Sequence, residues 1–154
     1  MRYTCTECGY VYDESKGEPT DDVAPGTKLD DLWDYFTCPG CYTDATSFVA
    51  AKEEVNYPLD KNNLSQIEKE HQIVLEVDKN ELSVRVGNPE HVMGEDHYIS
   101  SIVLLDENNE VIEERFLFPN DPPEIIFDLD YIDTFEVVVH CTQHGSWGTG
   151  KIQL

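Results

Sequence analysis

Two pairs of cysteines with Cys-x-x-Cys spacing are the feature that most constrains the fold of this 154-residue chain. The four residues are Cys5, Cys8, Cys38 and Cys41. Two such pairs can bring four thiolates to one ion in a tetrahedral site, so they predict a metal-bound module over residues 1–50. The fifth cysteine, Cys141, makes the count odd, and no apolar stretch near Met1 resembles a signal peptide. We therefore expect no disulfide framework, while the spacing alone leaves zinc and iron open as the metal.

The charge of the chain excludes two classes of function. There are 32 acidic and 10 basic side chains, for a formal net charge of -22. A nucleic-acid binder needs clustered Lys and Arg for phosphate contacts, and an anionic membrane surface repels such a chain, so we expect neither partner. The longest apolar runs, Ile102–Leu105 and Phe135–Val139, are far shorter than the ~20 residues that span a bilayer. A cytoplasmic protein is therefore expected.

The character of the sequence changes near residue 50. Residues 1–50 are rich in Gly, Pro, Asp and aromatic residues, 51–63 have the composition of a polar linker, and 64–154 have the pattern of β structure. Strand candidates in the last part are 72–77, 82–86, 97–105, 111–118, 125–129, 135–140 and 151–154. Short strands at this spacing predict an immunoglobulin-like antiparallel β-sandwich. The fold class is therefore mainly β, with at most one helical turn, at Leu64–Glu70.

Residues 1–50 resemble rubredoxin along their whole length. The matching stretches are Cys5–Asp13, Gly17–Pro19, Pro25–Thr27, Asp31–Leu32 and Cys38–Cys41. The resemblance implies a small rubredoxin-like metal-knuckle domain, in which Cys5, Cys8, Cys38 and Cys41 hold one iron. It also implies one-electron transfer between Fe(III) and Fe(II) with no open coordination position. Zinc is the alternative metal at this first site.

Three residues depart from the rubredoxin pattern. Trp33 stands where the family usually has Pro, Phe36 stands at the usual Trp, and Tyr42 replaces a small residue after the last Cys. Each of them keeps or adds apolar bulk. We therefore expect the core of the small domain to survive these changes.

All histidines of the chain lie after the predicted linker. They are His71, His91, His97, His140 and His144. A lone His is more often a surface or core residue than a ligand. Here, however, His91 and His97 lie close in sequence, and the unpaired cysteine heads a Cys141-x-x-His144-Gly145 turn after a β run. Clusters of this kind at strand ends predict a second metal site.

The pattern resembles the iron-binding domain of superoxide reductase, the family of desulfoferrodoxin and neelaredoxin, over about residues 66–154. The shared features are a His before a strand, the motif His91-x5-His97-Tyr98-Ile99 and the late Cys141-x-x-His144-Gly145 turn. The resemblance implies a second iron with four equatorial imidazoles and one axial thiolate. These ligands would be His71, His91, His97, His144 and Cys141. His140 precedes Cys141 on a strand, so its side chain should face away from the iron.

The resemblance implies one-electron reduction of superoxide to hydrogen peroxide at the position these five ligands leave open. The family commonly has Glu-Lys-His at the first ligand, with the Lys attracting superoxide and the Glu occupying the sixth position of ferric iron. This chain has Glu68-Lys69-Glu70-His71. Without a gap, Glu70 takes the Lys position and Lys69 the Glu position; with a one-residue insertion, Glu68 and Lys69 take the two roles. We favour Lys69 as the working cation and Glu68 as the carboxylate.

The resulting hypothesis is a two-iron superoxide reductase, an oxidoreductase acting on superoxide as acceptor, with electrons relayed by the rubredoxin domain. Its donor would be a rubredoxin reductase or another small carrier, and we expect a homo-oligomer, a dimer or tetramer. The alternative is a non-catalytic electron carrier or redox sensor, which the heavy acidity favours because superoxide is itself an anion. Trp147, after the last His, packs either beside the second site or simply in the core.

Overall fold

The chain divides between Glu53 and Glu54 into two units. The computed structural model describes residues 1–154, and the boundary falls inside the segment 51–63 that has the composition of a linker. None of the helices has both the length and the hydropathy needed to cross a membrane.

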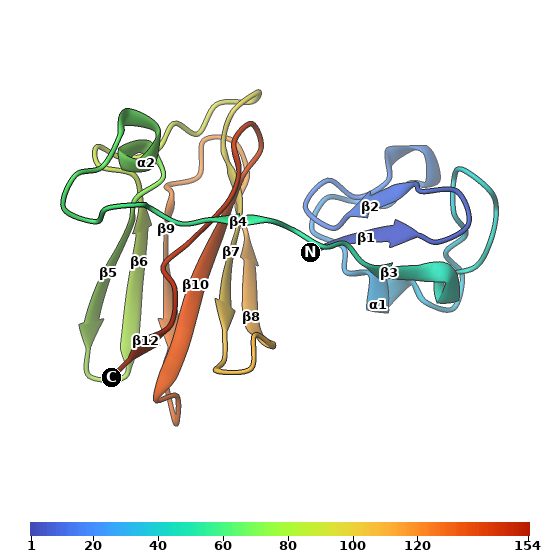
Figure 1. The fold of residues 1–154 in the computed structure, drawn as a ribbon. Coiled ribbons are helices and arrows are strands. Elements are labelled where there is room, and N and C mark those ends of the chain that lie inside the picture. Colours follow the sequence, from blue (N-terminus) through green and yellow to red (C-terminus); the bar gives the residue numbers. More distant parts are fainter. The chain divides into compact units, whose positions relative to one another are not determined.

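A three-stranded antiparallel sheet organises the first unit (Figure 1). Its order is β2–β1–β3, with β1 at Arg2–Cys5, β2 at Val11–Asp13 and β3 at Phe48–Ala50. The connection from β2 to β3 contains α1 (Leu29–Leu32) and two single 3₁₀ turns, η1 (Pro19–Asp21) and η2 (Ala45–Ser47). Strand β1 therefore ends at the first Cys pair, and β3 begins shortly after the second.

Aromatic rings fill the core of the first unit. Phe36 is buried between Tyr12 and Phe48, with ring centroids 5.2 and 5.5 Å away. Leu29 and Leu32 of α1 complete the same cluster. The expectation that Phe36 preserves the core is therefore correct.

Trp33 and Tyr42, which are 46% and 81% exposed, lie outside this core and leave it undisturbed. Trp33 follows Leu32 at the end of α1, and one step along a helix turns a side chain by about 100°. Because Leu32 points into the core, Trp33 points toward solvent. Tyr42 also lies outside the core, in a left-handed backbone conformation with φ at 61°.

Two β-sheets form the second unit. One has the order β4–β11–β10–β7–β8, with β12 also pairing with β10, and the other has the order β5–β6–β9. The strands are β4 (Val55–Asn56), β5 (Ile73–Asp78), β6 (Glu81–Val86), β7 (Ile99–Leu105), β8 (Val111–Phe116), β9 (Glu124–Asp128), β10 (Thr134–Cys141), β11 (Gly145–Gly148) and β12 (Ile152–Gln153). The predicted mainly β, immunoglobulin-like sandwich is confirmed, with one parallel pair, β4 with β11.

Side chains that point alternately inward and outward along the strands form the core between the two sheets. Leu82, Val84 and Val86 of β6 are fully buried, as expected when every second side chain points inward. They share one apolar cluster with residues of the other sheet, among them Phe135 and Val137 of β10. The core thus holds β10 and β7 rigidly, and β10 ends at Cys141.

Strands β4 and β11 were not foreseen from the sequence. Strand β11 reads Gly-Ser-Trp-Gly and has no β-branched residue, so it carries little strand propensity of its own. Strand β4 is two residues long and lies in the segment predicted as a linker. Both exist because β10 offers an edge on which β11 pairs, and β11 offers one to β4.

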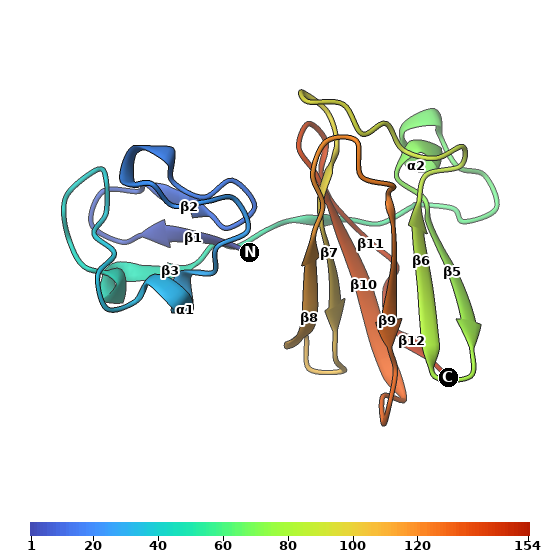
Figure 2. The same ribbon diagram turned by 180° about the vertical axis from the view of Figure 1, so that it is seen from behind.

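Three segments gather at one end of the second unit (Figures 1 and 2). They are helix α2 (Gln66–Glu70), the connection between β6 and β7, and the turn between β10 and β11. Each of these three segments carries or borders a predicted metal ligand.

Helix α2 begins with a capping box, in which the Ser65 hydroxyl accepts from the Glu68 amide and the Glu68 carboxylate accepts from the Ser65 amide.

Candidate metal centres

The two Cys-x-x-Cys turns of the first unit repeat the same backbone hydrogen bonds. The Cys5 amide donates to the Tyr10 carbonyl at 2.8 Å, and the Cys38 amide donates to the Thr43 carbonyl at 2.8 Å. Four residues after the first cysteine of each turn, the backbone is left-handed, at Gly9 (φ 78°) and at Tyr42 (φ 61°). Two copies of one local conformation therefore present their thiols to each other.

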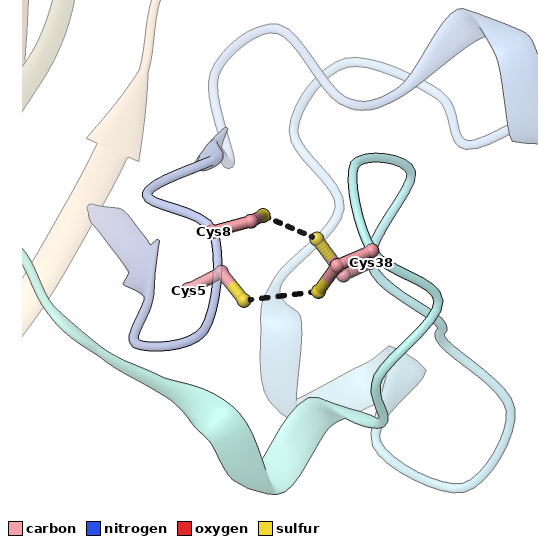
Figure 3. Close-up of side chains that lie close together, drawn as sticks. Cys5, Cys8 and Cys38 are labelled. Atoms are coloured by element: carbon pink, nitrogen blue, oxygen red, sulfur yellow. Dashed lines mark hydrogen bonds between the residues drawn. The ribbon is translucent and has the colours of Figure 1, made fainter.

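The four sulfur atoms of the first unit converge. Figure 3 shows the sulfur atoms of Cys5, Cys8 and Cys38 turned toward one another. The Sγ atoms of Cys5 and Cys41 are 3.7 Å apart, and those of Cys8 and Cys38 are 3.5 Å apart. A tetrahedral ion with metal–sulfur distances of ~2.3 Å requires sulfur pairs about 3.8 Å apart. The thiols, all free, therefore fit one tetrahedral ion.

The second cluster draws its side chains from three elements of the second unit. His71 is the C-cap of α2, and His91 and His97 lie in the connection from β6 to β7. Cys141 is the last residue of β10, and His144 lies in the turn before β11. The sequence prediction that these five residues meet agrees with their placement in the structure.

The four imidazole rings are arranged in a closed cycle. Ring centroids are 4.8 Å apart for His71 and His91, 4.8 Å for His91 and His97, 4.9 Å for His97 and His144, and 5.0 Å for His144 and His71. Neighbouring planes are inclined by 61° to 85°. Four rings in a cycle, each turned against the next, are suited to donate four nitrogen atoms to one central ion.

Backbone carbonyls select the tautomer of two of these rings. Nδ1 of His71 lies 2.7 Å from the Ile67 carbonyl and Nδ1 of His91 lies 2.6 Å from the Val92 carbonyl. Since a carbonyl only accepts, both Nδ1 atoms carry the proton and both Nε2 atoms present lone pairs. These Nε2 atoms are 3.3 Å apart. Two facing lone pairs at that distance repel unless a cation lies between them.

The Cys141 sulfur and the His97 ring also have the positions expected of metal ligands. Sγ of Cys141 lies 3.6 Å from Nε2 of His91 and 3.8 Å from Nδ1 of His144. Nε2 of His97 is buried and has no hydrogen-bond partner, which is costly for a polar atom unless it binds a ligand. The donor set of imidazole nitrogens and one thiol, with an orphaned nitrogen facing inward, fits a transition-metal ion.

Burial sets the protonation of the cluster. It lowers the pKa of His71, His91 and His97, for His91 to about 4, so these imidazoles are neutral at pH 7. The Glu70 carboxylate opposes each of these shifts. Burial also raises the pKa of the Cys141 thiol, and a bound cation would reverse that preference by favouring the thiolate.

Trp147 lies directly against the second cluster. Its ring stacks on His71 with centroids 4.8 Å apart and an interplanar angle of 14°, and its Nε1 donates to the His144 carbonyl at 3.2 Å. Trp147 also belongs to the buried apolar core, so both sequence interpretations of it hold together. His140 lies outside the cycle of rings, with its Nδ1 3.0 Å from the Ser146 hydroxyl.

The structure places Glu68 differently from the favoured sequence interpretation, whereas the role of Lys69 stays a prediction. Both oxygens of Glu68 are engaged by backbone amides, Oε2 by that of Ser65 at 2.6 Å and Oε1 by that of Leu59 at 3.2 Å. Glu68 is therefore a helix-capping residue, and this placement speaks against its role as a carboxylate at the metal. Lys69 is exposed on α2. The carboxylate whose charge reaches the cluster is Glu70, which the ungapped comparison places at the family's Lys position.

Comparisons with known proteins give separate matches for the two units. A sequence model of the rubredoxin family matches residues 2–48, and one of the desulfoferrodoxin family matches residues 61–150. The chain is 47% identical over 47 residues to the rubredoxin of Acinetobacter baylyi, covering 30% of this chain and 87% of that protein. It is 53% identical over 47 residues to the protein named Probable Rubredoxin-2 of Methanocaldococcus jannaschii, covering 30% and 84%.

One solved structure has a fold similar to that of this chain. A variant of the superoxide reductase (neelaredoxin) from Ignicoccus hospitalis aligns with a TM-score of 0.50 and 19% sequence identity, covering 64% of this chain and 93% of that chain. In donor type, the four thiols of the first unit match the iron site of rubredoxins. The imidazoles and thiol of the second unit match the iron site of desulfoferrodoxins.

Proposed function

Because the chain belongs to the desulfoferrodoxin family over residues 61–150 and to the rubredoxin family over residues 2–48, we propose that it is a superoxide reductase with its own electron-transfer domain. The reaction joins one superoxide anion, one electron and two protons into one molecule of hydrogen peroxide. The observation that carries the proposal is the closed cycle of His71, His91, His97 and His144 with the sulfur of Cys141 against it.

The five side chains of the second unit would hold one iron. When bound, that iron supplies a one-electron change of oxidation state, and the thiolate of Cys141 adds electron density to it. The carbonyls of Ile67 and Val92 keep the protons of His71 and His91 on Nδ1, so that Nε2 of each ring stays available as a donor. Five donors leave one position of a six-coordinate ion for a small anion.

The first unit would store and pass on the electron. Its four thiolates would close the first site completely, so it offers no position to a substrate. The donor in the cell would be a rubredoxin reductase or another small carrier. We place this chemistry in the cytoplasm, since all five cysteines are free thiols, as in reducing compartments. A dimeric or tetrameric assembly stays a prediction for measurement of the mass in solution.

Lys69 is our candidate for the cation that attracts superoxide. It is exposed two residues before His71, on the helix that carries His71 at its end. At cellular salt, a positive charge attracts an approaching anion when the two lie within a Debye length of about 8 Å, whereas the more distant charges of the chain are screened. In this proposal the local attraction by Lys69 outweighs the distant charges that make up the net charge of -22.

One observation favours a second candidate, a non-catalytic electron carrier or redox sensor. The carboxylate of Glu70 acts on His71, His91 and His97 and raises the pKa of each against the effect of burial. A negative charge beside the open position would repel superoxide. In that case the second iron would exchange electrons with a partner and leave superoxide unconsumed.

Pulse radiolysis separates the two candidates. The full chain, loaded with iron and fully reduced, is exposed to a pulse of superoxide while absorption follows both iron sites. The enzyme should consume superoxide in a second-order reaction and form one peroxide per superoxide without releasing dioxygen. Decay of superoxide at the rate of buffer alone would overturn the proposal in favour of the carrier. Metal analysis of the same sample distinguishes iron from zinc at the first site.

A further inference from the structure

The segment 55–59, which follows the boundary between the units, is bound to the same elements that hold the second cluster. We refer to it as the docked segment. Its strand β4 pairs in parallel with β11, with Val55 opposite Ser146 and Asn56 opposite Trp147. In addition, the Asn56 side-chain amide donates to the Ser146 carbonyl at 3.0 Å. Without β4, strand β11 would be an uncovered edge with open hydrogen-bonding groups.

Close packing holds the docked segment in this register. A methyl group on Gly148 would lie 2.7 Å from Cε1 of Tyr57 and 2.8 Å from Cγ1 of Val55, so only glycine leaves room for both. The Tyr57 hydroxyl donates to Oε1 of the buried Glu136 on β10 at 2.7 Å. The segment is therefore fastened to both β11 and β10, the two strands that flank the Cys141–His144 turn.

The other end of the docked segment reaches the support of His71. The Leu59 amide donates to Oε1 of Glu68 at 3.2 Å, and Glu68 caps α2. The carbonyl of Ile67 in that helix accepts from Nδ1 of His71. One short segment thus contacts the strand after His144 and the helix before His71.

Trp147 connects the docked segment to the ligands themselves. It stacks on His71 and donates to the backbone of His144, so its position governs one ring and the turn of another. A cavity of about 260 Å³ is lined by the stacked pair, His71 and Trp147, and by Lys61 of the connection. The cavity leaves open space beside these rings, and pairing of residue 147 with β10 on one side and β4 on the other holds its backbone.

We propose that Asn56 is a positioning residue of the second metal cluster, acting through the backbone of β11 and Trp147 on His71 and His144. The inference rests on the proposed metal binding by this cluster and is independent of whether superoxide is the substrate. Its role follows from two contacts, the pairing of Asn56 with Trp147 and the amide bond to the Ser146 carbonyl. Loss of that bond would leave the outer edge of β11 held only by its backbone pairing with β4.

The test compares Asn56→Ala and Asn56→Asp with Asn62→Ala in the full chain. Aspartate keeps the shape of asparagine but cannot donate, and Asn62 is an exposed residue of the same connection. The measurements are the Co²⁺ affinity of the second cluster by competition titration and the midpoint potential of the second iron. Both Asn56 variants should lose about tenfold in affinity, as for other outer partners of metal ligands, and shift the potential. Asn62→Ala and the first site should stay unchanged.

The outcomes separate the inference from the proposed function. Wild-type affinity and potential in both Asn56 variants would overturn the inference. A lower melting temperature with unchanged affinity and potential would also overturn it, because it assigns Asn56 to stability alone. Failure of the unaltered chain to bind metal at the second cluster would overturn the proposed function instead. Trp147→Phe, which keeps a stacking ring and removes the Nε1 donor, should move the potential in the same direction as Asn56→Ala.

Discussion

A methyl group on Gly40 would lie 2.9 Å from Sγ of Cys8, across the first cluster. Gly40→Ala should therefore push this sulfur out of its place. We expect the substitution to destabilise the metal-bound first unit by about 1–3 kcal/mol, as overpacking does, and to speed release of its metal. Thermal unfolding and the rate of metal loss to a chelator measure the two effects. The second cluster in the same chain serves as the internal reference and should lose metal at the unaltered rate.

Tyr42 holds a left-handed backbone at the place where the first Cys turn has Gly9. Because that conformation costs a residue with a Cβ about 1–2 kcal/mol, Tyr42→Gly should stabilise the first unit by about 1 kcal/mol. The side chain is largely exposed, so little packing is lost. Chemical denaturation followed by the absorption of the first metal site measures the change. Gly9→Ala, whose added Cβ meets no atom within 4 Å, should destabilise by a similar amount; equal stability of all three proteins would contradict the argument.

Removal of metal should affect the two units unequally. The first unit has a small apolar core and four converging thiols, and modules of this size commonly depend on their metal. The second unit has a larger core that spans two sheets. After chelation, amide hydrogen exchange should become fast in β1 and β3 and stay slow in β6 and β10. Retained protection of β1 in the metal-free protein would show that the first unit folds without metal.

Cys141→Ser should abolish consumption of superoxide and leave the visible absorption of the first iron intact. Serine keeps the shape of the side chain but removes the soft sulfur donor that faces His91 and His144. The measurements are pulse radiolysis and the absorption spectrum of each variant. Full activity in Cys141→Ser would remove this residue from the second site. Tyr131→Phe, at an exposed position of the same unit, serves as the unaffected control.

Removing the charge of Lys69 and removing the charge of Glu70 should have opposite effects on the rate of reaction with superoxide. Lys69→Ala should slow the reaction with superoxide, and Glu70→Gln should speed it, each by about two- to tenfold at low ionic strength. Both effects should shrink in 0.15 M salt, where charges beyond about 8 Å are largely screened. The second-order rate constants at two salt concentrations give the answer. If only the Glu70→Gln rate changes, the local field is set by the carboxylate and Lys69 has no part in it.

Much of the second site could be inferred from sequence because its ligands are rare residue types in a distinctive order. His91 and His97 form one local motif and Cys141 and His144 form another, and of these four residues only Cys141 lies on a strand. The cysteine pairs of the first unit are equally local, since each turn is built from its own backbone hydrogen bonds. Local conformation and donor chemistry therefore predicted the two clusters and the mainly β fold.

The sequence by itself predicted which side chains gather in the two clusters and most of the strands of the sandwich, though not β4 or β11. The tertiary structure alone decided what surrounds those side chains. The Leu59 amide reaches the capping residue Glu68 from the preceding connection and occupies its second oxygen, and Glu70 is the carboxylate that acts on the cluster. Asn56 gained its contact with Ser146 only because β11 leaves an edge beside it. The contact of Asn56 joins residues 90 positions apart in the chain, so no local pattern encodes it, whereas the Ser65-x-x-Glu68 capping box is local.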